Sequence, residues 1–449
     1  MDATALFVLD SLGVTIGARN APGIAAMTPA LRALEPAGGP ATLLTDGSKA
    51  GPATAAFLNA AAAHALEFDD THDEARIHAL CAVLPAALAV AEAQGGVSGE
   101  RFIAAIALGT ELFCRLGLSC PEFLDRGWHP TTAFGGISSA AACALLMDLD
   151  TEKIGHAMAA AYAQMCGNNQ SIADGALTKR AGPGFAARNG VTAAYLAAAG
   201  ITGPLRFLEG KSGLFALYQG DAAEPEALFR DWGKEWRLLD LSVKPYPCCR
   251  CTHGLIELGI DLHRQGIRPE EVAEGVLYLG GVNHKIVHAP FDPKNAADPV
   301  VHSQFNARYT FASGLADGRV DLATFDRSRV LSGNGALAER LTCEISPTIA
   351  ASSLPGASVT LRMRDGTTRT AANDKLLGAP DHPLTRDELL EKFRGALAHG
   401  QGASPAEAET LAQVVLDLPR ATSLSTMVNA LASVIRTPNE KSPTASQAA

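Results

Sequence analysis

The first half of the chain alternates between long apolar stretches rich in alanine and short polar or glycine-rich breaks. Leu80–Gln94 and Phe102–Leu118 are two such stretches, and a Gly-Gly-Val-Ser-Gly break separates them. Alanine has the highest helix propensity, and its small side chain lets helices pack closely. The pattern therefore predicts a succession of packed helices. Four more helices are predicted at Ala53–Glu67, Ser138–Met147, Ile154–Met165 and Phe185–Ala199.

The pattern changes near residue 235. Val272–Leu279 is rich in β-branched and aromatic residues, and Ala357–Met363 alternates between polar and apolar positions. Asp365-Gly366 then supplies the turn of a hairpin whose second strand begins at Thr367. These signals predict a smaller α+β unit at residues of about 236–372. Its predicted helices are Thr252–Arg264 and Phe305–Leu315.

Helical periodicity returns after Pro383. Helices are predicted at Arg386–Ala396, Pro405–Leu416 and Ser423–Ile435. We expect them to rejoin the first helical part, so that residues 1–235 and 373–436 form one discontinuous domain. The fold class is thus predicted as mainly α, with a large all-helical domain and a smaller α+β lid domain. The polar, proline- and serine-bearing tail at 437–449 is predicted to be disordered.

Composition narrows the class of protein. The 449 residues carry 37 basic and 47 acidic side chains, a net charge of 37 − 47 = −10, and 47% are hydrophobic. This composition excludes a wholly disordered chain, and the acidic balance disfavours nucleic acids and anionic membranes as partners. The apolar run Thr54–Leu66 is too short to span a bilayer. Nine scattered cysteines and an N-terminus without a basic leader favour a cytoplasmic protein.

One polar loop between two predicted helices, Glu67–His78, is dense in titratable groups. Its candidates for an acid, a base or a metal ligand are Asp69, Asp70, His72 and His78. A purely structural interpretation is equally open, in which the acidic residues end one helix and Thr71 caps the next.

Two further polar segments precede predicted helices. His129 stands before Pro130 in a stretch of hydroxyls and glycines, where backbone N–H groups at a helix start can meet an anion. Lys179 and Arg180 are adjacent cations in a glycine-rich loop, a pattern typical of carboxylate or phosphate recognition. A capped helix start and a solvated basic turn are the structural alternatives.

A fourth segment, 244–253, combines cations with cysteines. Lys244 and Arg250 are positioned to bind carboxylates, and His253 adds a titratable ring. The neighbouring thiols are Cys248, Cys249 and Cys251. Adjacent cysteines rarely ligate one tetrahedral zinc ion, and no second cysteine pair stands at finger spacing, so no metal is expected. A thiol redox or metal-binding protein remains the non-enzyme alternative.

At these segments the chain resembles the MmgE/PrpD family, whose members include 2-methylcitrate dehydratase, cis-aconitate decarboxylase and iminodisuccinate epimerase. The resemblance runs in order along nearly the whole chain. It rests on Asp10–Val14, Glu67–Thr71, His78 with Ala82–Pro85, Trp128–Gly135, Thr178–Arg180 with Gly184–Gly190, Lys244–Arg250 with Thr252–His253, and Ser303–Tyr309 with Ala316–Gly318. After His78 the chain has Ala-Leu-Cys, where dehydratases and decarboxylases of the family tend to have Pro-Ser.

The resemblance implies a homodimer that needs no cofactor and has its site in the cleft between the helical and lid domains. The catalytic residues that it implies are Asp69 or Asp70, His78, His129, Lys179, Lys244 and Tyr309. Arg180, Arg250 and His253 are added as substrate-binding residues. A small polycarboxylate is the expected substrate.

Dehydration of a 2-methylcitrate-like hydroxy acid by acid/base catalysis next to a carboxylate is the leading hypothesis for the reaction. Epimerisation of an amino-dicarboxylate such as iminodisuccinate and decarboxylation of a cis-aconitate type are the alternatives. His78 and His129 both begin predicted helices, so we expect the two rings to face one another at one site, with a lowered imidazole pKa.

Overall fold

The chain forms two compact units in the computed structural model, which describes residues 1–35 and 37–436. The first unit comprises Met1–Ser171, Leu177–Val243 and the described residues from Thr385 onward; the second comprises Ile172–Ala176 and Lys244–Leu384. The sequence predicted domain boundaries at 235/236 and 372/373. In the structure, the chain passes from the first unit to the second after Val243 and returns to the first unit after Leu384. The tail predicted to be disordered, 437–449, lies outside the described residues. The predicted class, mainly helical with a small α+β portion, is confirmed.

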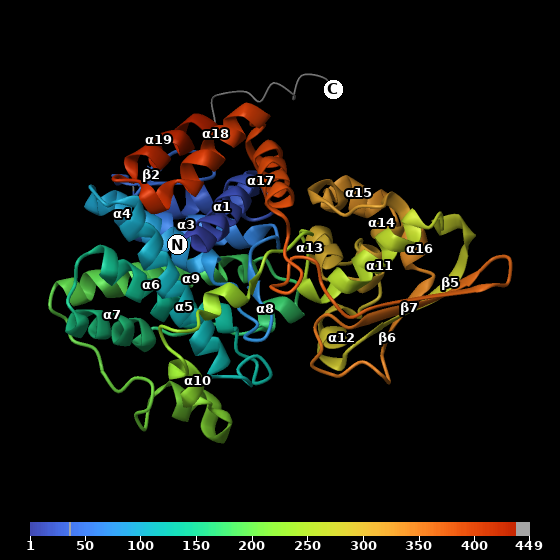
Figure 1. Cartoon of the computed structure of the whole chain (residues 1–449), viewed down its shortest axis with the longest axis horizontal. Helices are drawn as coiled ribbons and strands as arrows, with labels where there is room; N and C mark the ends of the chain where they lie inside the picture. Colours follow the sequence, from blue (N-terminus) through green and yellow to red (C-terminus); the bar gives the residue numbers. More distant parts are fainter. Residues whose placement is uncertain (36, 437–449) are drawn as a thin grey trace. The chain divides into compact units, whose positions relative to one another are not determined.

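Helices make up most of the first unit (Figure 1). Its elements are α1 (Asp2–Gly17), α2 (Ile24–Arg32), β1 (Ala41–Thr42), β2 (Lys49–Ala50), α3 (Pro52–Ala65), β3 (Thr71–His72), α4 (Leu80–Gln94), α5 (Gly99–Leu118), α6 (Pro130–Leu146), α7 (Thr151–Ala163), α9 (Thr178–Ala198), α10 (Pro225–Phe229), β4 (Leu241–Ser242), α17 (Arg386–Gln401), α18 (Pro405–Leu416) and α19 (Ser425–Val434). The short α8 (Gln170–Ala173) runs from this unit into the second.

The centre of the first unit is built from helices that are apolar on every side. In α4 each residue from Leu80 to Ala91 is buried, and in α3 burial is continuous from Ala55 to Ala65. A helix that is hydrophobic all round belongs in a core, because no face of it gains from contact with water. The end of α3 and the start of α4 therefore lie inside the unit, where titratable side chains are removed from water.

Two helices begin earlier than their sequence pattern predicted. α6 starts at Pro130 rather than Ser138, and α9 starts at Thr178 rather than Phe185. The glycine-rich stretch that suggested a loop is helical because its glycines permit close packing. A Cβ on Gly184 would lie 2.8 Å from the carbonyl oxygen of Phe57 in α3. Lys179 and Arg180 consequently lie in the first turn of a helix.

The C-terminal helix α17 packs tightly on α1. Its start is fixed by a capping box, in which Thr385 and Glu388 satisfy each other's backbone N–H groups. Farther along, a Cβ on Gly400 would lie 2.5 Å from the Ile16 carbonyl oxygen and 2.6 Å from the Cα of Gly17. The two backbones thus approach as closely as glycine allows, and this fixes the register of α17 on α1.

The second unit has one four-stranded sheet with helices packed against it (Figure 1). Its strand order is β6-β5-β7-β8, with β5 parallel to β6 and antiparallel to β7. Gly366 has a φ of +88° in the predicted hairpin turn between β7 and β8. The elements are α11 (His253–Arg264), β5 (Val272–Leu279), α12 (Gly281–Val287), α13 (Pro299–Gln304), α14 (Ala307–Asp317), α15 (Arg327–Ser332), α16 (Gly335–Ala338), β6 (Leu341–Ile345), β7 (Ala357–Met363) and β8 (Thr368–Asn373).

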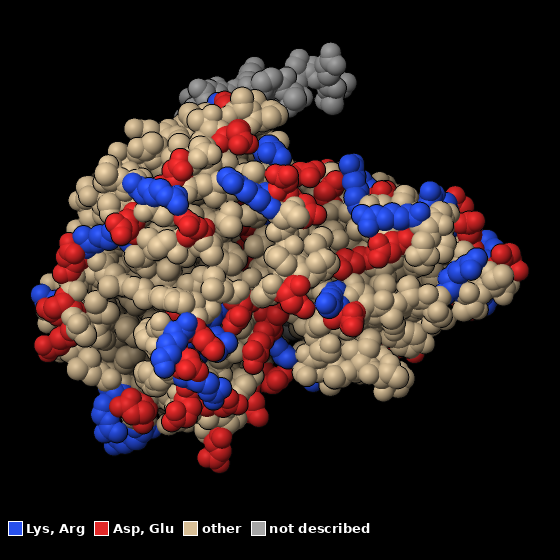
Figure 2. All heavy atoms as spheres, in the orientation of Figure 1, with Lys and Arg blue, Asp and Glu red and all other residues tan. Residues whose placement is uncertain are grey.

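The surface carries charges of both signs. On the face drawn in Figure 2, basic and acidic side chains of the described residues lie interspersed among uncharged ones. Within the described ranges, no helix combines the length and the apolar character that a membrane crossing requires.

Candidate active site

Glu67–Asp70, the acidic turn, follows α3 and folds back onto the end of that helix. Glu67 has a φ of +54°, in the left-handed region that residues other than glycine seldom adopt. The reversal brings the carboxylate of Asp69 to His64, with Oδ2 2.7 Å from Nδ1. Both side chains are fully buried. A buried carboxylate and imidazole are tolerated because each satisfies the other.

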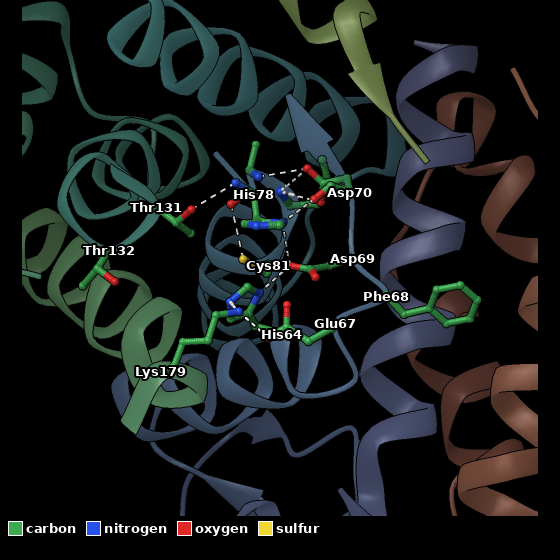
Figure 3. A network of polar contacts seen from close by, with 12 residues as sticks. His64, Glu67, Phe68, Asp69, Asp70, His78, Cys81, Thr131, Thr132 and Lys179 are labelled. Atoms are coloured by element: carbon green, nitrogen blue, oxygen red, sulfur yellow. Dashed lines mark hydrogen bonds and ion pairs between the residues drawn. The ribbon is translucent and has the colours of Figure 1, made fainter. Parts of the chain in front are cut away.

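Lys179, in the first turn of α9, reaches the same cluster. Its Nζ lies 2.9 Å from Nε2 of His64 and forms an ion pair with Glu67. An ammonium group can only donate, so Nε2 of His64 accepts and Nδ1 carries the proton that is donated to Asp69. His64 therefore links the cation to the carboxylate as a neutral ring. Figure 3 shows these side chains converging from α3, α9 and the acidic turn.

The side chain of Asp70 lies at the start of α4. Its carboxylate accepts the N–H groups of Ala79 at 2.9 Å and Leu80 at 3.1 Å. Burial, followed by the charge of Asp69, raises the pKa of Asp70 to about 7, although those two N–H groups act in the opposite direction. The structural interpretation had given the capping role to Thr71, but Thr71 lies in β3. Asp70 caps α4 instead, because its carboxylate accepts both N–H groups at the helix start.

His78 is held by the backbone of the acidic turn. Its Nδ1 lies 2.7 Å from the carbonyl oxygen of Asp70 and 3.4 Å from Oδ2 of Asp69. A carbonyl oxygen only accepts, so Nδ1 carries a proton, and Nε2 carries a lone pair whenever the ring is neutral. The side chain is 18% exposed, which allows exchange of protons with water.

In His129 the proton lies on the other ring nitrogen, Nε2. It is the N-cap of α6, where Nδ1 accepts the backbone N–H of Thr132 at 3.3 Å and lies 2.9 Å from the hydroxyl of the same residue. Nε2 of the neutral ring is therefore an N–H donor. Burial, with the charge of Lys179 as the next cause, holds the pKa of His129 well below its usual range. The ring stays neutral near pH 7.

Both histidines lie beside His64. Its ring centroid is 4.8 Å from that of His78 and 6.5 Å from that of His129. The expectation that two helix starts bring these rings to one place agrees with this geometry. The cluster combines one ring whose Nε2 offers a lone pair when the ring is neutral, one ring that offers an N–H group, and one ammonium group. Such a set can bind a carboxylate, stabilise developing negative charge and transfer a proton.

The other predicted residues have partners elsewhere. Arg180, beside Lys179 in α9, is buried and donates to the carbonyl oxygen of Pro22 at 2.6 Å. In the second unit, Arg250 donates to the Leu377 carbonyl oxygen at 2.9 Å and lies 3.2 Å from Nδ1 of His253. Their substrate-binding roles stay predictions.

Tyr309 and Lys244 also belong to the second unit. The Tyr309 hydroxyl is buried and donates to the carbonyl oxygen of Thr324 at 2.7 Å. Burial raises the pKa of Tyr309 to about 12. This arrangement gives the ring a packing role within its unit, and its catalytic role stays a prediction. Lys244 follows β4 by two residues, and its role likewise stays a prediction.

Metal ligation fits this cluster poorly. Among the described residues, one group offers three ligand atoms within 4.8 Å of one another: His64, Asp69 and Cys81. A thiol ligates as thiolate, yet burial, with Asp69 as the next cause, raises the pKa of Cys81 well above its usual value. The Lys179 ammonium also lies against His64, where a metal cation would be repelled.

His64 and Glu67 are the participants for which the sequence analysis assigned no role. His64 stands alone in a run of alanines, and its isolation was the available signal. A histidine that is buried in such a helix must have a polar partner from another segment, because an unsatisfied buried polar group is costly.

Comparison with known proteins identifies the family of the chain. The family model "MmgE/PrpD N-terminal domain" matches residues 1–226, and "MmgE/PrpD C-terminal domain" matches residues 246–418. The cis-aconitate decarboxylase of Aspergillus terreus is 29% identical over 421 residues, covering 87% of this chain and 84% of that protein. The cis-aconitate decarboxylase-like protein oryM of Aspergillus oryzae is 31% identical over 369 residues, covering 77% and 75%. The cis-aconitate decarboxylase of Mus musculus is 28% identical over 360 residues, covering 76% and 71%.

Proposed function

Because the chain belongs to the MmgE/PrpD family, we propose that it is a lyase that removes carbon dioxide from a small unsaturated tricarboxylate of the cis-aconitate type. Family membership and the decarboxylase relatives support the coarser conclusion, a lyase acting on a carboxylate substrate. The observation that carries the finer proposal is that the relatives of known activity are cis-aconitate decarboxylases. The cluster supplies the groups that this reaction needs, with a proton acceptor at Nε2 of His78 and an N–H group at Nε2 of His129.

In the proposed reaction, the bond from carbon to the departing carboxylate breaks and its electron pair forms a new carbon–carbon double bond. The original double bond shifts, and its far carbon takes up one proton for each carbon dioxide released. The conjugated carboxylates of the substrate accept the electron pair, so the proposal needs no cofactor.

Each residue of the cluster has a task in this scheme. Lys179 attracts a substrate carboxylate with its ammonium group. His129, neutral and buried, donates its N–H group to the oxygen on which charge develops. His78, partly exposed, takes a proton from water at Nε2 and delivers it to carbon. Asp69 and Asp70 hold the rings of His64 and His78 in these tautomers.

Dehydration of a 2-methylcitrate-like hydroxy acid is the second candidate, because the same two rings supply a base and a donor. In that case His78 takes the proton next to the carboxylate, and His129 stabilises the resulting charge. Epimerisation needs the same proton abstraction without loss of a group. These reactions differ in their products rather than in the residues that they require.

A substrate panel tests the proposal. The purified chain is incubated in D₂O with cis-aconitate, 2-methylcitrate, citrate or iminodisuccinate, and products are followed by NMR. We expect carbon dioxide and one deuterium per product molecule from cis-aconitate, with this activity lost in His78→Gln. His399→Gln, an exposed change on α17, is the matched control and should retain activity. Water loss from 2-methylcitrate alone would support the second candidate. Deuterium exchange alone, without loss of a group, would support an epimerase.

A homodimer is part of the proposal and rests on the family resemblance. Light scattering of the purified chain should give twice the 46.6 kDa of one chain.

A further inference from the structure

Lys392 stands outside the segments that the sequence analysis singled out, yet it touches the acidic turn. It lies in α17, 324 residues after Phe68, and its Nζ is 2.8 Å from the Phe68 carbonyl oxygen. The same nitrogen is 2.7 Å from Oδ1 of Asp10 in α1 and 4.1 Å from the centroid of the Phe68 ring. The side chains of Lys392 and Asp10 are both buried.

Phe68 is oriented differently from its neighbours. Glu67 and Asp69 turn toward Lys179 and His64, whereas the Phe68 ring points away from the cluster (Figure 3). The carbonyl oxygen that Lys392 binds belongs to the peptide group between Phe68 and Asp69. That peptide plane includes the Cα atom of Asp69, so holding the plane restricts the directions in which the Asp69 side chain can leave the backbone.

This support matters because the turn itself is strained. Glu67 holds a left-handed backbone conformation, which persists only where the surrounding structure enforces it. Lys392 supplies one such constraint with a hydrogen bond, an ion pair to Asp10 and a cation–π contact. The close packing of α17 on α1 at Gly400 keeps the lysine in register with Asp10.

We propose that Lys392 is a positioning residue for the catalytic cluster: it holds the Phe68 carbonyl group and with it the acidic turn, so that the Asp69 carboxylate sets the proton position on His64 and the Asp70 carbonyl group sets that on His78. The proposal rests on the proposed function for its catalytic consequence. Its structural part, the control of two histidine tautomers, is independent of which substrate is used.

The test compares variants whose stability can be separated from positioning. Lys392→Met removes the ammonium group that both Asp10 and the Phe68 carbonyl group contact. This variant therefore leaves the Asp10 carboxylate buried without its cation and, at the same time, releases the Phe68 carbonyl group. Asp10→Asn with Lys392→Met removes both charges, which restores a neutral interior while the Phe68 carbonyl oxygen still lacks its donor. Arg394→Met is the matched control. It lies two residues along α17 and loses a partly exposed ion pair to Glu409.

The primary measurement is ¹⁵N NMR of histidine-labelled protein, with signals assigned by His64→Gln, His78→Gln and His129→Gln. In the double variant we expect the His64 and His78 tautomer signals to change. The His129 signals should remain, because its own helix start fixes that ring. Unchanged signals of His64 and His78 in the folded double variant would overturn the proposal.

Turnover supplies a second readout in the same variants. The double variant should lose at least about tenfold in kcat while KM changes by less than about threefold, because Lys392 positions a catalytic group and does not bind substrate. Arg394→Met should match the unchanged chain. A normal kcat in the double variant would overturn the catalytic consequence. If the unchanged chain and all variants show no turnover, the result counts against the proposed function. The positioning role of Lys392 is then tested by the ¹⁵N NMR spectra of the histidines alone.

A third measurement needs no destabilising variant. In ¹⁵N-lysine-labelled protein the Lys392 ammonium signal, identified by its loss in Lys392→Arg, should be visible and slow to exchange because the group is buried and hydrogen-bonded. A signal in fast exchange with water would contradict the anchoring that the proposal requires.

Discussion

The ammonium group of Lys179 lies 2.9 Å from Nε2 of His64, and this contact joins the start of helix α9 to the last turn of α3. Since the lysine also pairs with Glu67, and His64 with Asp69, a positive group is held among buried carboxylates. The arrangement keeps a cation available inside the unit for the carboxylates of a substrate.

Replacing Lys179 with methionine should lower kcat/KM by at least about tenfold. A hydrogen bond to a charged group contributes about 1.5–3 kcal/mol, and a tenfold change corresponds to about 1.4 kcal/mol. Steady-state kinetics with the best substrate of the panel provide the measurement. The paired variant Glu67→Gln/Lys179→Met separates loss of the cation from the effect of leaving a buried carboxylate behind. Lys211→Met, an exposed change in the same unit, is the control. Turnover close to normal in the paired variant would remove Lys179 from the mechanism.

Asp70 should make stability depend on pH. Its pKa is raised from 3.8 to about 7 by burial, so the folded chain holds a proton over a range in which the unfolded chain has released it. The free energy of unfolding must therefore fall as pH rises from about 4 to about 7 and level off above, with a slope of at most about 1.4 kcal/mol per pH unit. Asp70→Asn, which still offers an acceptor to Ala79 and Leu80, should lack this fall.

Urea unfolding of both chains between pH 4.5 and 8.5 measures the difference. Asp365→Asn is the control, since that exposed carboxyl has a lowered pKa and stays ionised throughout this range. Parallel stability curves for the unchanged chain and Asp70→Asn would show that Asp70 titrates normally.

The cysteines should be largely unreactive in the folded chain. Cys166 is exposed, whereas the other eight of the nine thiols are buried. A thiol reagent at pH 8.5 should modify one cysteine rapidly, and Cys166→Ser should abolish that reaction; unfolding in urea should release all nine. Fast modification at Cys248, Cys249 or Cys251 would revive the thiol redox alternative.

Two glycines of α17 should respond to alanine in opposite directions. Gly400→Ala would place a methyl group against the backbone of α1 and should lower the free energy of unfolding by about 1–3 kcal/mol. Gly395→Ala meets no neighbouring atom within 4 Å and should raise it by up to about 1 kcal/mol through helix propensity. Urea unfolding compares them. Equal effects would contradict the close packing that places Lys392.

Much of the fold was predictable because local signals mark its elements. Leu80–Gln94, Val272–Leu279 and Pro405–Leu416 were predicted with the bounds that the structure gives them. Apolar periodicity, capping residues and turn residues act over a few positions, so a sequence reveals them. The early starts of α6 and α9 were missed because glycine and proline near a helix start suggest a loop, whereas here the glycines serve close packing between helices.

The site was predictable only in part. His78, His129 and Lys179 stood out because each lies in a polar break between apolar helices. His64 and Lys392 did not, since each sits within a helix and its partner lies on another segment of the chain. A pairing between residues hundreds of positions apart leaves no local pattern, and the tautomers of the histidines follow from those pairings.

The most direct test of the proposed decarboxylation is one NMR experiment on cis-aconitate in D₂O with the unchanged chain and with His78→Gln. We expect the unchanged chain to release carbon dioxide and to place one deuterium on carbon in each product molecule. We expect His78→Gln to lose at least about a hundredfold in rate, within the 10²–10⁴-fold range typical of general acid–base catalysis, while remaining folded. Decarboxylation at a normal rate by His78→Gln, or no decarboxylation by the unchanged chain, would contradict the proposed mechanism.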